Sequence, residues 1–250
     1  MGFKDHFSAH AADYARYRPG YPPALFAWLA GVAPARGQAL DCGTGNGQAA
    51  LALAEHFERV TAIDPSAEQI AAATPHPRVR YSVAAAESPV CAPASVDLIS
   101  VAQALHWFDL DRFYAECRRA LKPGGVLAAW TYGLCRIATP IDAAVERFYR
   151  DTVGSYWPPE RHHIDAGYAT LPFPFERLRT PDVAMRADWS LDEFIGYLAT
   201  WSAVRRYIRE RGEDPTRALR AELSEHWVPA GARREIVWPL ALLAGRAVAR

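Results

Sequence analysis

The chain has 250 residues, of which 50% are hydrophobic and 22% are charged. This balance is typical of a folded globular protein and excludes a disordered chain. Its 28 basic residues equal its 28 acidic residues, so no overall positive field is available to attract nucleic acid.

The first residues and the cysteines indicate a cytoplasmic protein without a metal site. The opening M-G-F-K-D-H-F-S lacks the apolar core of a signal peptide, and no apolar run is long enough to cross a membrane. The cysteines form no C-x-x-C pair and have no histidines at zinc-ligand spacing, so we expect reduced core thiols. They are Cys42, Cys91, Cys117 and Cys135.

Residues 1–30 are expected to form an N-terminal helical gate. An amphipathic helix is followed by Y-R-P-G-Y-P-P at 17–23 and by a second short helix. Arg18 and Tyr21 are candidates to close over a ligand, although a stiff proline-rich turn explains the same residues.

Residues 31–135 are expected to form the ligand-binding core. Short β-branched runs alternate with helical patterns, which is typical of βαβ units and a parallel sheet. The first strand is predicted to end at 39–41, and four more to lie at 60–63, 79–83, 96–102 and 126–131. Helices are predicted at about 48–57, 66–74 and 109–121.

Residues 136–235 are rich in Trp, Tyr, Arg and Pro and are expected to form a cap with late strands. Helices are predicted at 140–151, 190–211 and 215–226. The apolar segment within 236–250 is predicted to return to the sheet as a terminal strand. The whole chain, 1–250, is therefore expected to be a single domain.

The segment Asp41-Cys42-Gly43-Thr44-Gly45-Asn46-Gly47 lies between a predicted strand and a predicted helix. Glycines there allow positive φ angles and let a ligand approach the backbone, which indicates a nucleotide-type site. The dinucleotide fingerprint G-x-G-x-x-G needs a glycine at 48, where Gln48 stands. A nicotinamide-dependent oxidoreductase is therefore disfavoured but remains a rival class.

Asp64 follows the second predicted strand, about 20 residues beyond the glycines, where an acidic side chain can accept hydrogen bonds from ribose hydroxyls. The alternative is an anion that stabilises the N-terminus of the next helix. A carboxylate here disfavours a cofactor with a 2′-phosphate.

Four motifs together resemble those of class I S-adenosylmethionine-dependent methyltransferases, and within that class the trans-aconitate methyltransferase-like group. They are D-C-G-T-G-N-G, I-D-P-S, V-D-L-I-S-V-A-Q-A-L-H-W-F-D and L-K-P-G-G-V-L. F-S-A-H-A-A-D-Y-A-R-Y-R-P-G-Y-P and L-A-T-W-S-A-V-R-R-Y extend the resemblance to the gate and the cap. It implies an α/β fold: a Rossmann-like, doubly wound, mostly parallel seven-stranded sheet with an N-terminal helical gate and an inserted helical cap.

The resemblance also implies S-adenosyl-L-methionine as cofactor. The loop at Gly43, Thr44 and Gly45 would then hold its methionine part, with Asp41 near the ammonium group. Asp64 would bind the ribose. The remaining cofactor contacts would come from Ala86 and Glu87 beside adenine and from Gln103 beside the methionine moiety. Many relatives carry an aspartate where this sequence has Ala85, so the adenine contact departs from the pattern.

A sulfonium methyl group is already activated, so the protein mainly aligns donor and acceptor. A carboxylate acceptor is already ionised at neutral pH. A hydroxyl, amine or acidic carbon would benefit from a base, for which His106 is the candidate because it follows the fourth strand. The alternative for His106-Trp107-Phe108 is an aromatic corner that packs the next helix.

Trp107 and three cap residues are further candidates to bind substrate. The cap residues Trp201, Arg205 and Arg206 share one predicted helix, and arginine forks suit carboxylates. A solvated helix face is the alternative. We expect O-methylation of a small carboxylate, with C-, N- or O-methylation of a quinone or natural product as the alternative. Ala102–Leu105 stands where many base-modifying methyltransferases carry N-P-P-Y, which disfavours nucleic acid. A monomer and a homodimer both remain open.

Overall fold

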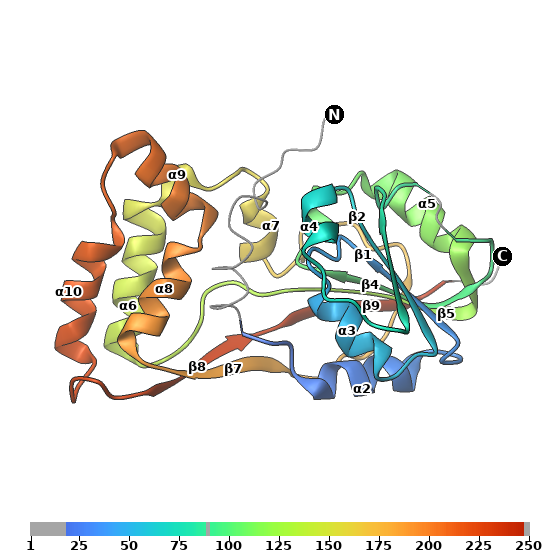
Figure 1. Cartoon of the computed structure of the whole chain (residues 1–250), viewed down its shortest axis with the longest axis horizontal. Helices are drawn as coiled ribbons and strands as arrows, with labels where there is room; N and C mark the ends of the chain where they lie inside the picture. The colour runs from blue at the N-terminus through green and yellow to red at the C-terminus, as the bar shows by residue number, and fades with distance from the viewer. Residues whose placement is uncertain (1–18, 89–90, 248–250) are drawn as a thin grey trace.

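The computed structural model describes residues 19–88 and 91–247. Figure 1 shows an α/β core at one end, a helical cap at the other, and long strands running between them. Among the described residues, no helix combines the length and apolar character needed to cross a bilayer.

The core contains a seven-stranded sheet of order β3-β2-β1-β4-β5-β9-β6. β1 to β5 pair in parallel, whereas β9 pairs antiparallel with both β5 and β6. This confirms the predicted fold class. The strands are β1 (Gln38–Cys42), β2 (Arg59–Asp64), β3 (Val79–Val83), β4 (Val96–Ala102), β5 (Leu121–Thr131), β6 (Glu176–Arg177) and β9 (Ala241–Arg246).

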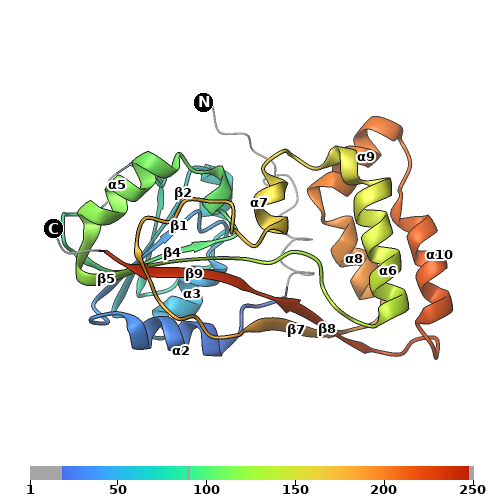
Figure 2. The ribbon, with the colours of Figure 1, turned by 180° about the vertical axis from the view of Figure 1, so that it is seen from behind.

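Helices cover both faces of this sheet (Figures 1 and 2). α2 (Pro23–Val32) and α3 (Gln48–Ala54) pack on one face, and α5 (Leu110–Ala120) packs on the other. The short α4 (Ala67–Ala71) follows β2. Neighbouring strand residues alternate between the two layers: Ala39 packs with α2 and α3, and Leu40 packs with α5. The central strands are apolar because both of their faces are buried.

The expected gate over 1–30 lies partly outside the described residues. Its second helix is α2, which buries Leu25, Phe26 and Leu29 in the same cluster as α3 and the sheet. α2 is therefore a layer of the core.

The cap has a hydrophobic cluster of its own. It contains α6 (Thr139–Arg147), the π-helical turn η3 (Phe148–Thr152), the short η4 (Gly154–Tyr156), α8 (Leu191–Ala199), α9 (Ser202–Arg211) and α10 (Thr216–His226). β7 (Ala184–Trp189) and β8 (Arg234–Pro239) form a separate antiparallel pair. The short α7 (Arg161–Asp165) contacts η2 (Leu105–Trp107), which follows β4.

The prediction of a single helix over 190–211 is wrong, because the structure has two helices there, α8 and α9, with a helix break between them. The Thr200 hydroxyl donates to the Tyr197 carbonyl at 2.6 Å, and Trp201 is extended. The break buries the Trp201 side chain among cap aromatics, where it is 5% exposed. The predicted terminal strand is also divided: Ile236 lies in β8, and only β9 joins the main sheet.

Asp97, at the start of β4, joins the entry points of three neighbouring strands. Its fully buried carboxylate accepts hydrogen bonds from the backbone N–H groups of Gly37 and Gln38, at 3.1 and 2.8 Å, just before and in β1. Lys122 Nζ, in β5, donates to the same carboxylate at 2.8 Å. One buried side chain therefore sets the alignment of β1, β4 and β5.

Replacing Asp97 by alanine is expected to lower the free energy of unfolding by about 3 kcal/mol, because two backbone donors and a lysine lose a buried acceptor. Urea denaturation at neutral pH measures the change. Asp182→Ala, at an exposed position, is the matched control. Equal denaturation midpoints for the two variants would contradict the role assigned to Asp97.

Candidate active site

The loop after β1 takes a conformation that favours glycine. Gly43, Gly45 and Gly47 have φ angles of 68°, 56° and 93°. A Cβ atom at Gly43 would lie 2.6 Å from Cβ of Ala104, so the loop after β1 packs directly against the loop after β4. Backbone donors of the first loop and side chains of the second thus meet at the carboxyl edge of the sheet, where ligands bind in open α/β folds.

Asp64 holds this loop to the end of β2. One carboxylate oxygen accepts from the backbone N–H of Gly45 and the other from that of Ser66, both at 2.9 Å. The residue is 8% exposed. A carboxylate oxygen can accept more than one hydrogen bond, so these contacts still permit Asp64 to accept from ligand hydroxyls.

Asp41, in β1, is a fully buried carboxylate. The hydroxyls of Thr44 and Ser100 each donate to it at 2.6 Å. Within 19–88 and 91–247, no cation forms an ion pair with it. Burial raises its pKa from 3.8 to about 6, and the two hydroxyls oppose that rise. A carboxylate buried without a cation suits a positively charged ligand group.

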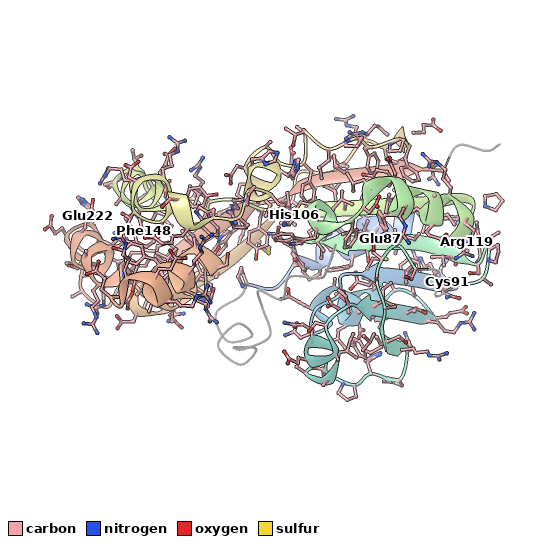
Figure 3. All side chains as sticks on the ribbon, turned by 90° about the horizontal axis from the view of Figure 1, so that it is seen from above. Glu87, Cys91, His106, Arg119, Phe148 and Glu222 are labelled. Carbon is pink, nitrogen blue, oxygen red and sulfur yellow. The ribbon has the colours of Figure 1, made fainter. Side chains whose placement is uncertain are left out.

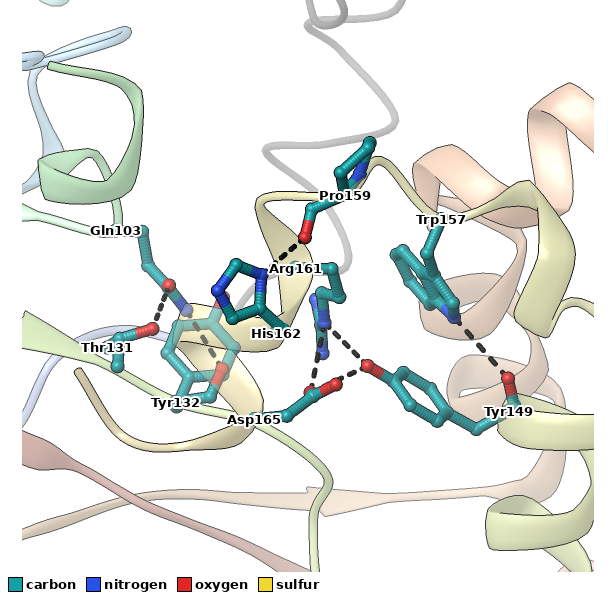
Figure 4. A network of polar contacts seen from close by, with 9 residues as sticks. All are labelled: Gln103, Thr131, Tyr132, Tyr149, Trp157, Pro159, Arg161, His162 and Asp165. Carbon is teal, nitrogen blue, oxygen red and sulfur yellow. Dashed lines mark hydrogen bonds and ion pairs between the residues drawn. The ribbon is translucent and has the colours of Figure 1, made fainter. Parts of the chain in front are cut away.

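Gln103, after β4, is a non-glycine residue with a φ of 57°. Its side chain is fastened to β5: the Thr131 hydroxyl donates to Oε1 at 2.6 Å, and Nε2 donates to the Tyr132 carbonyl at 3.2 Å (Figure 4). Left-handed backbone at such a residue is strained, and strain of this kind concentrates at functional sites.

His106, in η2, lies where the core meets the cap (Figure 3). Its Nδ1 is 3.1 Å from the hydroxyl of Tyr168, a fully buried residue that also has a positive φ, 63°. Burial, followed by the positive charges of Arg161 and His163, lowers the pKa of His106 from 6.5 to about 3. The imidazole is therefore neutral at physiological pH.

Comparison with known proteins identifies the family to which this chain belongs. Residues 40–129 match a model described as a methyltransferase domain. A candidate methyltransferase of Dictyostelium discoideum is 37% identical over 216 residues, which are 85% of this chain and 82% of that protein. A solved candidate type II methyltransferase of Anaeromyxobacter dehalogenans is 52% identical with a TM-score of 0.89, over 94% of this chain and 100% of that one.

This chain belongs to the S-adenosylmethionine-dependent methyltransferases. An uncharacterized methyltransferase of Mycobacterium tuberculosis is also 37% identical, but over 48% of this chain and 49% of its own length. The family replaces the nicotinamide-dependent oxidoreductase as an explanation of the glycine loop.

The residues at the carboxyl edge fit S-adenosylmethionine. The Asp41 carboxylate, buried and bound by two hydroxyls, would complement the ammonium group, and Asp64, whose oxygens each accept one backbone hydrogen bond, would keep acceptor capacity for the ribose hydroxyls. Near the expected adenine position, Ala86 is 8% exposed, and Oε1 of Glu87 accepts from the backbone N–H of Asp109 at 2.8 Å. Glu87 therefore also anchors the N-cap residue of α5.

The predicted acceptor-side residues have different surroundings. Trp107 is 37% exposed and lies 4.7 Å from the His106 ring between centroids. The Tyr21 ring packs edge-on against Trp130 and touches both the core and the cap clusters. Arg18 lies outside the described residues.

The cap candidates do not form one binding face. Trp201 is buried among aromatic rings, and Arg205 is half-buried at the start of α9. Arg206 is exposed and pairs with Glu210 at 2.7 Å, which is the arrangement of a solvated helix face. That alternative fits Arg206 better than contact with a substrate.

The sequence analysis did not identify two residues of the candidate site, Ser100 and Arg161. Ser100 is one of two polar residues within the buried strand β4, and its position one strand over from Asp41 was a usable signal. Arg161 lies in W-P-P-E-R-H-H, a segment with no motif, and only the packing of α7 onto η2 brings it near His106.

Gly43→Val is expected to weaken binding of S-adenosylhomocysteine by more than about tenfold, because the new side chain would meet Ala104 and strain the loop. Calorimetric titration measures the affinity. Gly31→Ala is the control, since nothing lies within 4 Å of its added Cβ. Undiminished affinity in a folded Gly43→Val protein would rule out this loop as the cofactor site.

The raised pKa of Asp41 makes stability depend on pH. Between about pH 4 and pH 6 the folded state binds more protons at Asp41 than the unfolded chain does, so ionisation destabilises the fold as pH rises. A shift of this size corresponds to about 3 kcal/mol at most. Asp41→Asn has no carboxyl group to ionise at this position. The free energy of unfolding of the unligated variant, relative to that of the unligated native protein, should therefore increase when the pH is raised from 4.5 to 7.5. Chemical denaturation at the two pH values measures the difference, and an unchanged difference would contradict the raised pKa.

Proposed function

We propose that this methyltransferase methylates a carboxylate oxygen of a small organic acid. The observation that carries the proposal is the half-buried imidazole of His106, whose Nδ1 lies 3.1 Å from the Tyr168 hydroxyl and whose pKa is lowered by burial to about 3. A base with so low a pKa removes protons poorly from hydroxyls, amines or acidic carbons, whose own pKa values are far higher. A carboxylate needs no such help, because it is already ionised at neutral pH.

S-adenosylmethionine supplies a methyl group on a sulfonium when it is bound. The chain itself then has to orient the acceptor and keep water away. Leu105 and Tyr168, both fully buried, support this shielding beside η2. The strained Gln103 supports positioning, because its hydrogen bonds to Thr131 and Tyr132 hold the loop after β4 in one conformation.

A small acceptor agrees with the charge and the architecture. The formal net charge is zero, so a polyanionic nucleic acid finds no general attraction. The cap adds aromatic and arginine side chains at α7, which contacts η2, and such additions differentiate acceptors on a shared core.

Radiolabelled methyl transfer to carboxylic acids, phenols, alcohols and amines tests the proposal. The expected product is an ester, which alkali cleaves to labelled methanol. His106→Gln should keep kcat within about threefold, whereas loss of a true general base would cost about 100-fold or more. Labelled products that resist alkali, together with a large loss of rate in His106→Gln, would overturn the proposal.

A further inference from the structure

We infer that Arg161 binds an anionic group of the acceptor and so determines which acids this enzyme selects. The inference rests on the proposed function for the class of acceptor. It concerns α7 and the aromatic residues packed around it, which lie outside the cofactor motifs.

The guanidinium of Arg161 is held in one orientation by a closed set of hydrogen bonds (Figure 4). Its Nε donates to the Tyr149 hydroxyl at 2.7 Å and to Asp165 Oδ1 at 3.3 Å. The Tyr149 hydroxyl donates to the same Asp165 oxygen at 2.6 Å. Tyr149 belongs to the π-helical turn η3, a kind of irregularity that is frequent at functional sites.

Aromatic rings support the same guanidinium. Its central carbon lies 4.4 Å from the ring centroid of Trp157 and 5.1 Å from that of Tyr149. Trp157 is in turn packed against Trp201, 5.5 Å away between centroids. The Arg161 side chain is only 18% exposed, and such a partly desolvated charge attracts an anion more strongly than an arginine in free solvent does.

The outer edge of the guanidinium is left for a ligand. Neither Nη atom forms a hydrogen bond with any residue of 19–88 or 91–247. Two Nη donors side by side match the two oxygens of a carboxylate. Asp165 offsets part of the charge, but it is 45% exposed and engages the Nε side.

Arg161 also lies on a helix, α7, that packs onto η2, the turn that carries His106. The charge of Arg161 acts on both His106 and Tyr168. A guanidinium bound to the reacting carboxylate would reduce its nucleophilicity and lose a charged partner on ester formation. Arg161 therefore suits an acidic group other than the one that receives the methyl group.

Binding of acids to the S-adenosylhomocysteine complex tests this inference without turnover. Succinate, glutarate and citrate are compared by calorimetry with butyrate and valerate, each of which has one acidic group. Arg161→Met should weaken binding of the di- and triacids by about 10- to 100-fold, because a charge-assisted pair of hydrogen bonds is lost. Affinity for the monoacids and for S-adenosylhomocysteine should change by less than about threefold.

Two further variants separate anion binding from packing. Arg161→Lys keeps the positive charge without the paired Nη donors, so its affinity for the di- and triacids should lie between those of the native enzyme and Arg161→Met. If Arg161→Met does not fold, Arg161→Lys provides the test in its place. Arg206→Met removes an exposed cap arginine and should change nothing. In turnover, the effect should fall on KM for the diacids rather than on kcat.

The outcomes distinguish this inference from the proposed function. Arg161-dependent binding of diacids without methylation of any carboxylate would support the inference and overturn the proposed function. Methylation of carboxylates with equal KM values in native enzyme and Arg161→Met would support the proposed function and overturn the inference about Arg161. Equal weakening of monoacids and diacids, or no binding of any diacid to the native complex, would also overturn the inference.

Discussion

The carboxylate of Asp64 holds the glycine loop against the end of β2, and the geometry of the site depends on that contact. Its two oxygens accept from the backbone of Gly45 and Ser66, which belong to different loops. The left-handed glycines are thereby kept at the carboxyl edge of the sheet, against the loop after β4. The same edge places Asp41, with its raised pKa, beneath the loop.

The electrostatics of the site divide between the core and the cap. The core contributes buried carboxylates, which suit the cationic and hydroxylated parts of the cofactor. The cap side contributes Arg161, whose positive charge helps to keep His106 neutral. This division agrees with the proposed carboxylate acceptor, which needs no proton removed, and with the anion-binding role inferred for Arg161.

Elements formed by local interactions were predicted correctly from the sequence, whereas elements that depend on contacts distant in the chain were not. The strand at 96–102 is mostly apolar because it is buried on both faces, whereas the strand at 79–83 is a partly buried edge strand that its β-branched and aromatic residues indicate. Both strands were predicted correctly. The helix at 190–211 was not, because the break at Thr200 and Trp201 depends on aromatic partners from η3 and the segment after η4. The π-helical turn at Phe148–Thr152 and the position of α7 had no local signal either.

The sequence by itself determined the sheet core, the glycine loop and the positions of Asp41 and Asp64, because each depends on spacing within one strand, loop and helix. The tertiary structure alone decided that Ser100 donates to Asp41, that Arg206 faces solvent, and that α7, which carries Arg161, packs onto η2, which carries His106. The Ser100–Asp41 contact joins residues 59 positions apart through the pairing of β1 with β4, and the contact of α7 with η2 comes from packing of the cap on the core. No local periodicity in the sequence records either relation.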